Sequence, residues 1–342
     1  MHTALFCSYV EPEHVESLKR RFPTVRFEYH PSLLPKPRYT ADHIGEPIKR
    51  STEQDEQWRC LLQSSNILFD FDYFGLERFK QDAKQVEWIQ ASSAGVGQFV
   101  LKHRLHELPA VITTASGIHA RPLAEFVLWS MLSFSRGYPT ARKQQREHVW
   151  QRFCGEELAG KVLAIVGLGE IGQAAAQLAS CLGVETIGSK RTVAGITPQD
   201  LGVAELYNKN DLSRMLSRAD YVCLVSPHTP ETEGMIGEAE LSAMKPDAVL
   251  INIGRGALIQ EAPLLRALQE GWIRGAVLDV APLEPLPPEH PLWEMENVIL
   301  FPHSASTSSK ENERLINLFA DNLEHFLSKE PLTNVFDASR LY

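Results

Sequence analysis

A glycine-rich turn between an apolar run and a helical stretch constrains the fold of this chain more than any other sequence feature. The run Val162–Val166 leads directly into Gly-Leu-Gly-Glu-Ile-Gly at 167–172, and the helix-forming stretch Gln173–Leu182 follows. In such a turn the first glycine permits a tight bend, the second lets backbone amides approach a pyrophosphate, and the third lets the helix pack on the strand. The amino end of the helix adds partial positive charge. This context predicts a dinucleotide site with contacts from Gly167, Gly169, Glu170, Ile171 and Gly172.

Short β-branched runs alternate with helical patterns from Lys161 onward, which predicts a parallel α/β sheet. Most of these runs are continuously apolar, as is typical of strands covered by helices on both faces. We therefore expect a doubly wound parallel-sheet (Rossmann) domain with strands at Val162–Val166, Val184–Gly188, Tyr221–Val225, Ala248–Ile253, Gly275–Leu278 and Val298–Phe301. A weaker α/β pattern in the first part of the chain predicts a smaller second sheet, with strands at Ala4–Tyr9, Val25–Tyr29, Asn66–Phe69 and Trp88–Ala91.

The length of 342 residues favours two domains, because one hydrophobic core rarely organises so long a chain. We expect a dinucleotide-binding domain over residues 121–304. It is inserted into a smaller, flavodoxin-like α/β substrate domain made of residues 1–120 and 305–342. The helical pattern Leu123–Ser135 is expected to link the two halves, and the amphipathic tail Arg314–Leu327 is expected to pack back on the first domain.

Composition argues against several kinds of partner. The formal net charge of −9 disfavours nucleic acid, whose binders concentrate Lys and Arg. The apolar start Ala4–Cys7 soon meets Glu11 and Glu13, so we expect no signal peptide, no membrane span and a cytoplasmic location.

The segment Pro31–Gln57 is rich in proline and charge, which opposes regular structure, and it receives no role. Widely spaced cysteines, mostly in apolar runs, predict buried free thiols in a reducing compartment and no metal site: Cys7, Cys60, Cys154, Cys181 and Cys223.

The residues after the second strand of the inserted domain indicate which dinucleotide is bound. In NAD enzymes an acidic residue at this point accepts hydrogen bonds from the adenosine ribose. Here the strand end reads Gly188-Ser189-Lys190-Arg191-Thr192, which contains no acid. Lys190 and Arg191 suit the 2′-phosphate of NADP by charge and by the forked donors of arginine. We expect Ser189, Lys190 and Arg191 to contact NADP(H). Use of NAD(H) stays open, because two cations are also typical of a solvated strand end.

Polar residues gather at the expected carboxyl ends of the later strands, where doubly wound sheets bind ligands. They are Arg255 between two glycines, Asp279 at a strand end, Glu284 in the next loop and His303 after the last strand. A guanidinium can hold a carboxylate by two parallel hydrogen bonds and polarise a neighbouring carbonyl. A histidine can protonate the developing alkoxide, and a carboxylate beside it orients the ring and stabilises the imidazolium. The set predicts reduction of a 2-keto acid, although each residue alone is also typical of an ordinary loop.

Taken together, these segments resemble the D-isomer-specific 2-hydroxyacid dehydrogenase family over nearly the whole chain. Besides the glycine turn, the similarity rests on Ser-Pro-His-Thr-Pro-Glu-Thr at 226–232, Asn-Ile-Gly-Arg-Gly at 252–256, Leu-Asp-Val at 278–280 with Glu284-Pro285, and Pro-His-Ser-Ala at 302–305. The resemblance implies a catalytic set of Arg255, Glu284 and His303. It implies substrate contacts from Arg255 and from the backbone amides of Ala94 and Gly95, and further cofactor contacts from Pro227, Thr232, Ile253, Gly254 and Asp279.

The resemblance also implies an NAD(P)-dependent oxidoreductase of small 2-keto acids, with glyoxylate or hydroxypyruvate as expected substrates and a homodimer as the expected assembly. Branched keto acids stay open. Formate dehydrogenases share the scaffold but carry glutamine at the position of Glu284, which disfavours that branch. Because the chain ends at Tyr342, we expect no regulatory domain of the kind that long phosphoglycerate dehydrogenases add. Another class is a dinucleotide-sensing corepressor, which keeps the fold and the catalytic trio. His119, near the expected hinge, either lines the cleft or starts a helix.

Overall fold

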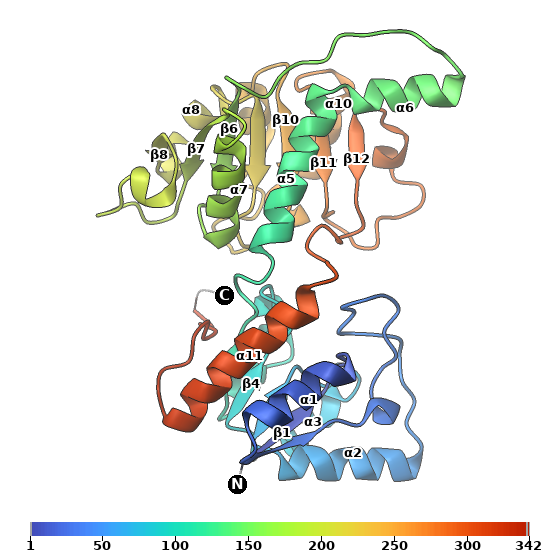
Figure 1. The fold of residues 1–342 in the computed structure, drawn as a ribbon. Helices are drawn as coiled ribbons and strands as arrows, with labels where there is room; N and C mark the ends of the chain where they lie inside the picture. Colours follow the sequence, from blue (N-terminus) through green and yellow to red (C-terminus); the bar gives the residue numbers. More distant parts are fainter. Residues whose placement is uncertain (1, 340, 342) are drawn as a thin grey trace. The chain divides into compact units, whose positions relative to one another are not determined.

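The chain folds into two compact units. The computed structural model describes residues 2–339 and 341. These residues group into a terminal unit, made of the described residues up to 118 and from 307 onward, and an inserted unit, made of residues 119–306. Each unit is built on one parallel sheet, of five strands in the terminal unit and seven in the inserted unit (Figure 1). The predicted fold class, an α/β domain inserted into a second α/β domain, is confirmed.

The inserted unit has short, parallel strands. Their bounds are β6 (Val162–Val166), β7 (Glu185–Ser189), β8 (Glu205–Tyr207), β9 (Tyr221–Leu224), β10 (Val249–Asn252), β11 (Gly275–Leu278) and β12 (Val298–Leu300). They pair in the order β12-β11-β10-β9-β6-β7-β8. The central strands β6, β9, β10 and β11 are buried along nearly their whole length. The continuously apolar runs in the sequence are therefore explained by cover on both faces of the sheet.

Helices supply that cover. They are α5 (Ala120–Ser135), α7 (Glu170–Ser180), α8 (Leu212–Leu216), α9 (Glu238–Ala243) and α10 (Glu261–Gln269). Helix α6 (Tyr138–Glu147) follows α5 and takes no part in it. Leu163 and Ile165 of β6 join a core with α5 and α7, whereas Ala164 and Val166 join a second core with α8, α9 and α10. Alternate residues of one strand thus face opposite layers. This is the doubly wound arrangement predicted from the sequence.

The terminal unit has the strand order of flavodoxin-like sheets, β2-β1-β3-β4-β5. Its strands are β1 (His2–Phe6), β2 (Val25–Glu28), β3 (Ile67–Phe69), β4 (Trp88–Gln90) and β5 (Val111–Thr113). Helices α1 (Pro12–Arg21) and α11 (Glu311–Ser328) pack on one face, and α2 (Thr52–Ser64), α3 (Leu76–Asp82) and α4 (Gly97–Lys102) pack on the other. In α11, Phe319 stacks on Trp88 with ring centroids 5.1 Å apart. The prediction that this tail packs back on the first domain is confirmed.

Strands β5 and β8 and helix α6 are among the elements that the sequence did not predict, because they are short or bury no residue. Strands β5 and β8 lie at sheet edges and have three residues each, and Val111 of β5 is 43% exposed. Helix α6 buries none of its residues. The expectation that Pro31–Gln57 has no regular structure is wrong for its last six residues, which begin α2. Ser51 caps that helix by accepting from the amide of Gln54, whose side chain accepts from the amide of Ser51 in return.

The composition-based expectations had mixed outcomes. Cys7 and Cys223 are buried free thiols, as predicted, but Cys60, Cys154 and Cys181 are free and exposed. The prediction failed for these three because an apolar neighbourhood in sequence does not fix burial: Cys60 is on an exposed part of α2, Cys154 lies in the segment between α6 and β6, and Cys181 follows α7. Among the residues that the structure describes, no helix combines the length and the apolar character that crossing a bilayer requires.

Candidate active site

The turn after β6 has the geometry required of a phosphate-binding glycine turn. Gly167 adopts φ +114°, and a Cβ there would lie 2.9 Å from a backbone nitrogen of the loop after β9. A Cβ on Gly172 would lie 2.4 Å from the carbonyl oxygen of Gly167, so the chain's own packing requires both glycines. A Cβ on Gly169 would meet nothing within 4 Å. Gly169 thus leaves open space at the amino end of α7, where Glu170 and Ile171 begin the helix, and this space fits a pyrophosphate.

The end of β7 is tied to the same turn. The carbonyl oxygen of Ser189 accepts hydrogen bonds from the amides of Gly167 at 3.1 Å and Leu168 at 3.0 Å. The Lys190 ammonium donates to the carbonyl oxygen of Leu168 at 3.0 Å, and the following Arg191 is exposed. Lys190 therefore lies beside the glycine turn, where its charge can act on a bound dinucleotide.

The loop after β9 lies against the glycine turn. The Ser226 hydroxyl donates to the carbonyl oxygen of Val166 at 3.0 Å. Within the loop, the Thr232 hydroxyl donates to the carbonyl oxygen of Pro227 at 2.7 Å and accepts from the amide of Thr229 at 2.8 Å. These bonds close residues 226–232 into a compact turn. Pro227 and Thr232, both predicted cofactor contacts, are thus held in one loop beside the glycines.

Arg255 lies in a loop that an asparagine shapes. Asn252, the last residue of β10, accepts from the amide of Gly254 at 3.1 Å and donates to the carbonyl oxygen of Arg255 at 3.0 Å. The half-buried guanidinium donates to the carbonyl oxygen of Gly254 at 2.7 Å. Burial lowers the pKa of Arg255, although the charges of Glu284 and Asp279 oppose this effect. The guanidinium is therefore close enough to both carboxyl groups to interact with them electrostatically.

Glu284 and His303 form a hydrogen-bonded pair. The Nδ1 atom of His303 lies 2.8 Å from Oε2 of Glu284, and Oε1 of Glu284 accepts from the amide of Ala281 at 3.0 Å. Burial alone would raise the pKa of Glu284, but the hydrogen bond from His303, the Ala281 amide and the charges of His303 and Arg255 outweigh burial and lower it. Glu284 is therefore ionised at neutral pH. Because a carboxylate can only accept, Nδ1 donates, and Nε2 is the ring nitrogen left to exchange a proton with a substrate.

Asp279 holds the turn that carries His303. Its Oδ1 atom accepts from the amides of Ser304 and Ala305, both at 2.9 Å, and its backbone carbonyl accepts from the amide of His303 at 2.8 Å. The turn places His303 at φ +53°, which is uncommon for a residue other than glycine. Burial raises the pKa of Asp279, although these amides and the charge of His303 favour its ionised form. Contact of Asp279 with a cofactor stays a prediction.

The predicted substrate loop, Ser92–Gly97, lies in the terminal unit and joins β4 to α4. Ala94 is half-buried and Gly95 is exposed. The amide of Gly95 donates to the hydroxyl of Ser93 at 3.2 Å, whereas the amide of Ala94 has no acceptor within the described part of the chain. An amide without a protein acceptor suits the binding of a carboxylate.

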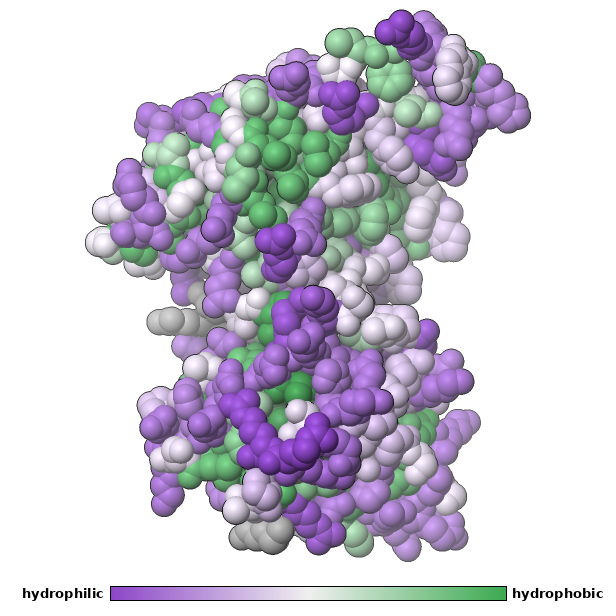
Figure 2. All heavy atoms as spheres, viewed as in Figure 1, coloured by the Kyte–Doolittle hydropathy of each residue, from purple (hydrophilic) through white to green (hydrophobic). Residues whose placement is uncertain are grey.

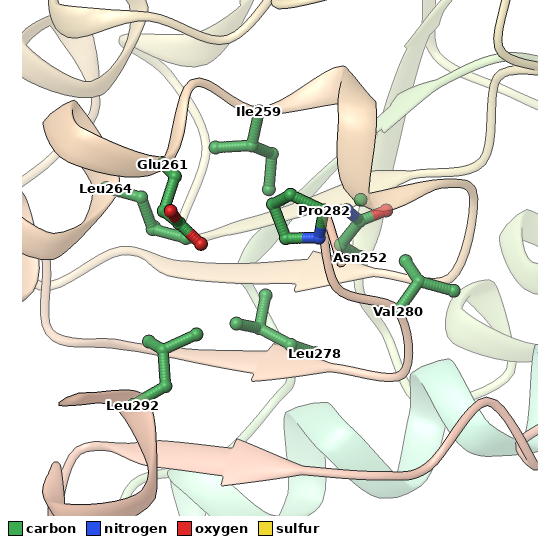
Figure 3. A pocket seen from close by; sticks show the side chains of 9 residues that line it. Asn252, Ile259, Glu261, Leu264, Leu278, Val280, Pro282 and Leu292 are labelled. Carbon is green, nitrogen blue, oxygen red and sulfur yellow. The ribbon is translucent and has the colours of Figure 1, made fainter. Parts of the chain in front are cut away.

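A small cavity lies under the Arg255 loop (Figure 3). Its volume is about 10 Å³, which is room for about one water. Figure 3 shows that Asn252 and Leu278, at the ends of β10 and β11, line it together with side chains of the segments that follow these strands. The cavity is too small for a dinucleotide or a keto acid, so it belongs to the packing beneath the loop.

The structure brings most of the predicted site residues to one sheet edge, because the carboxyl ends of parallel strands emerge together. That edge carries the glycine turn and the loops of residues 189–191, 226–232, 253–255, 279–284 and 303–305. Sequence reasoning missed Asn252 and the supporting role of Asp279. A polar residue closing an apolar strand was the available signal for both. His119 is the N-cap residue of α5, in line with the helix-start alternative, and makes no side-chain cap hydrogen bond.

Sequence comparison relates this chain to known enzymes. Residues 128–305, more than half of the chain, match the profile described as D-isomer specific 2-hydroxyacid dehydrogenase, NAD binding domain. A glyoxylate reductase of Aeropyrum pernix is 37% identical over 224 residues, which are 63% of this chain and 66% of that relative. A D-3-phosphoglycerate dehydrogenase of Methanocaldococcus jannaschii is 34% identical over 227 residues, which are 66% of this chain and 43% of that relative. The chain thus spans slightly under two thirds of the first relative and less than half of the second.

Solved structures match over nearly the full length. A D-isomer specific 2-hydroxyacid dehydrogenase family protein from Aeromonas salmonicida has a TM-score of 0.79 and 28% identity, and the match covers 98% of this chain and 99% of that one. A D-isomer specific 2-hydroxyacid dehydrogenase from Xanthobacter autotrophicus, solved in complex with NADPH and MES, has a TM-score of 0.79 and 25% identity, and the match covers 100% of this chain and 99% of that one. Both units are therefore present in these relatives.

Proposed function

We propose that this chain, which belongs to the D-isomer-specific 2-hydroxyacid dehydrogenase family, is a reductase of small 2-keto acids that prefers NADPH. The observation that carries the proposal is the 2.8 Å hydrogen bond between His303 and Glu284 close to Arg255. A histidine oriented by a carboxylate, a guanidinium and a dinucleotide turn at one sheet edge are the groups that such a reduction needs. Glyoxylate and hydroxypyruvate are the expected substrates, and the relatives named glyoxylate reductase support this choice.

In the proposed reaction, Arg255 binds the substrate carboxylate and polarises the keto carbonyl. Ala94 and Gly95 keep their predicted role as substrate contacts through their backbone amides. Bound NADPH supplies the hydride to the keto carbon. His303 donates the proton on Nε2 to the carbonyl oxygen, so the substrate gains one hydride and one proton and leaves as a 2-hydroxy acid. Glu284 stays ionised and stabilises the imidazolium before the transfer.

The inserted unit is proposed to hold the dinucleotide, within boundaries near residues 121 and 304, and the terminal unit to supply the remaining substrate contacts. The open space beside Gly169 fits the pyrophosphate. The ribose end is expected to lie near Lys190 and Arg191, where no acid is present to repel a 2′-phosphate. The NADPH complex of the Xanthobacter autotrophicus relative supports NADPH as the preferred cofactor.

Neutralising Lys190 and Arg191 tests the cofactor preference. We expect the double variant Lys190→Gln/Arg191→Gln to raise KM for NADPH by about tenfold or more. Each substitution would remove a charge-assisted hydrogen bond to the 2′-phosphate. KM for NADH should change much less. The control is Arg214→Gln, which removes an exposed cation near Glu205, at the opposite end of the strands. Equal kcat/KM for NADPH and NADH in the unmodified enzyme would contradict the preference.

A substrate panel tests the proposed activity itself. Purified protein is mixed with NADPH or NADH and with glyoxylate, hydroxypyruvate, pyruvate and branched 2-keto acids, and oxidation of the cofactor is followed by absorbance. We expect turnover of at least one small member with NADPH. If no keto acid is reduced while the dinucleotide still binds, the result favours the corepressor alternative. The next measurement is then the binding of peptides.

The charge of Glu284 predicts a pH effect. Its pKa is lowered, so it is ionised at neutral pH and stabilises protonated His303, the form that drives reduction. Reductase activity should therefore fall at acid pH, when Glu284 takes up a proton and the imidazolium loses its ionised partner. In Glu284→Gln that partner is absent at every pH, so we expect kcat at neutral pH to be lower by about tenfold or more, without an acid limb caused by Glu284. The same kcat profile in both proteins would show that Glu284 does not act on His303.

We also propose a homodimer built on the inserted unit. The α5 face, defined as Trp129, Leu132, Tyr138 and Phe301, exposes between 37% and 44% of each residue. Its aromatic rings contact one another, with Trp129 and Phe301 at 5.3 Å between centroids. Figure 2 shows hydrophobic side chains gathered over α5, and α6 with the segment after it extends away from the sheet in Figure 1. An apolar face of this kind is typical of a protein interface.

Mass measurement tests the dimer. By sedimentation velocity or light scattering we expect the unmodified protein to have twice the mass of one chain. Leu132→Glu should shift it toward one chain, because a buried charge would replace an apolar contact. The matched control is Leu182→Glu, since Leu182 is 41% exposed against 39% for Leu132 but lies after α7, outside the α5 face. A monomeric unmodified protein at micromolar concentration would refute the dimer.

A further inference from the structure

A buried aspartate lies beside the Ser92–Gly97 loop. Strands β3 and β4 pair in parallel with Phe69 opposite Gln90, so the residues after them emerge side by side at one sheet edge. Asp70 follows β3 directly, and its amide donates to the carbonyl oxygen of Gln90 at 2.8 Å. Its relative exposure is 0%. The proposed keto-acid reduction assigns no role to Asp70.

The carboxyl group of Asp70 contacts the first residue of the loop. Its Oδ1 atom accepts from the hydroxyl of Tyr73 at 3.0 Å and, through a long bond of 3.4 Å, from the amide of Ser92. Its Oδ2 atom is buried and has no hydrogen-bond partner within the described part of the chain. Burial raises the pKa of the group, although the charge of His43 and hydrogen bonds from Ser92 and Tyr73 oppose this. A buried carboxyl with one unsatisfied oxygen does not serve stability alone.

The backbone of Asp70 is also unfavourable. Its φ is +70°, in the left-handed region that glycine adopts freely and that aspartate and asparagine occupy only occasionally. Glycine at this position would relax the backbone and remove the unsatisfied oxygen. Residues kept in such a conformation with a costly side chain are concentrated at functional sites. The position therefore retains an aspartate for a reason other than the energy of the local fold.

The loop has a second attachment on its other side, where the amide of Ala115 donates to the carbonyl oxygen of Ser93 at 3.2 Å. That bond joins backbone atoms only, whereas Asp70 holds the loop through a side chain. We propose that Asp70 is a positioning residue that orients the Ala94 and Gly95 amides toward the substrate carboxylate, and so determines the affinity for 2-keto acids. The inference rests on the proposed function of this loop.

Two substitutions separate positioning from stability. Asp70→Gly deletes the carboxyl and suits φ +70°, so the variant should fold with an unchanged melting temperature or a higher one. We expect its KM for glyoxylate, or for the best substrate of the panel, to rise about tenfold or more, because misplaced contacts weaken binding, while kcat and KM for NADPH change by less than about threefold. Asp70→Asn keeps an acceptor of the same shape and tolerates the left-handed backbone, so KM should return close to that of the unmodified enzyme.

Asp72 supplies a matched control. It is also a buried carboxylate after β3, but it accepts from the indole nitrogen of Trp58 at 2.8 Å and, within the described residues, from no atom of the loop. Asp72→Ala should lower the melting temperature without raising KM. Either of two results would overturn the proposal: an unchanged KM in Asp70→Gly, or an equal rise in Asp72→Ala.

Amide hydrogen exchange gives a readout that needs no turnover. Exchange over residues 92–97 should be faster in Asp70→Gly than in the unmodified protein or in Asp72→Ala. If the unmodified protein reduces no keto acid, the proposed function fails, yet exchange still decides whether Asp70 holds the loop. Unchanged exchange in Asp70→Gly would refute the positioning role even in an active enzyme.

Discussion

Replacing His303 with glutamine is expected to lower kcat for 2-keto-acid reduction by about 10²- to 10⁴-fold, the usual contribution of a general acid. Glutamine can still hydrogen-bond to Glu284, whose oxygen lies 2.8 Å from the histidine Nδ1. It has no ionisable proton to give to the carbonyl oxygen. KM for NADPH should stay within about threefold, because the glycine turn is untouched. The measurement is the steady-state and single-turnover rate near neutral pH with saturating NADPH.

His290 supplies a matched control for this substitution. Its Nε2 atom lies 3.0 Å from Oε1 of Glu261, so it is also a histidine paired with a glutamate in the inserted unit. His290→Gln should leave kcat within about twofold of the unmodified enzyme, because His290 donates no proton to the substrate. Turnover at the unmodified rate in His303→Gln would show that another group supplies the proton.

Replacing Arg255 with alanine is expected to reduce kcat/KM for the keto acid by about 10³-fold, with a rise in KM as well as a fall in kcat. The variant would lose two charge-assisted hydrogen bonds to the carboxylate and the positive charge that polarises the carbonyl. It would also leave Glu284 without a cation that lowers its pKa. Steady-state kinetics over a wide range of keto-acid concentration separates the two parameters.

Two further variants test whether the loss is specific to the guanidinium of Arg255. Arg255→Lys keeps the charge but not the fork of donors, so it should recover only part of the lost kcat/KM. Arg266→Ala removes an exposed arginine of α10 that pairs with Glu238, and it should leave both parameters unchanged within about twofold. If Arg255→Ala raised KM no more than Arg266→Ala does, Arg255 would not be the carboxylate anchor.

The sequence predicted the layered fold well, because burial of short strands and amphipathic helices leaves a local pattern. The runs at residues 162–166 and 275–278 coincide with β6 and β11. The pattern failed for α6, which buries no residue, and for β5 and β8, two edge strands of three residues each. Elements without a buried face carry no hydrophobic period, so only their contacts identify them.

The residue types of the candidate site could be predicted from the sequence, but the contacts that hold these residues in place could not. Gly172 is required by contacts with Gly167 and Ile165 within one strand-turn-helix unit, which is a local arrangement, whereas Gly167 packs against Ser226 of the loop after β9. Asp279 and His303 are 24 positions apart, and Asp279 holds the His303 turn only because β11 and β12 are neighbours in the sheet. Asn252, likewise, shows its role only once the path of the Arg255 loop is known.

By itself, then, the sequence determined the class of fold, the dinucleotide turn and the chemical groups for a keto-acid reduction, since periodicity and motif spacing are local properties. Only the tertiary structure decided that Lys190 bonds to the glycine turn, that Asp279 holds the turn of His303, and that Asp70 lies beside the Ser92–Gly97 loop. These contacts join segments that are distant along the chain, and strand order is what brings such segments together.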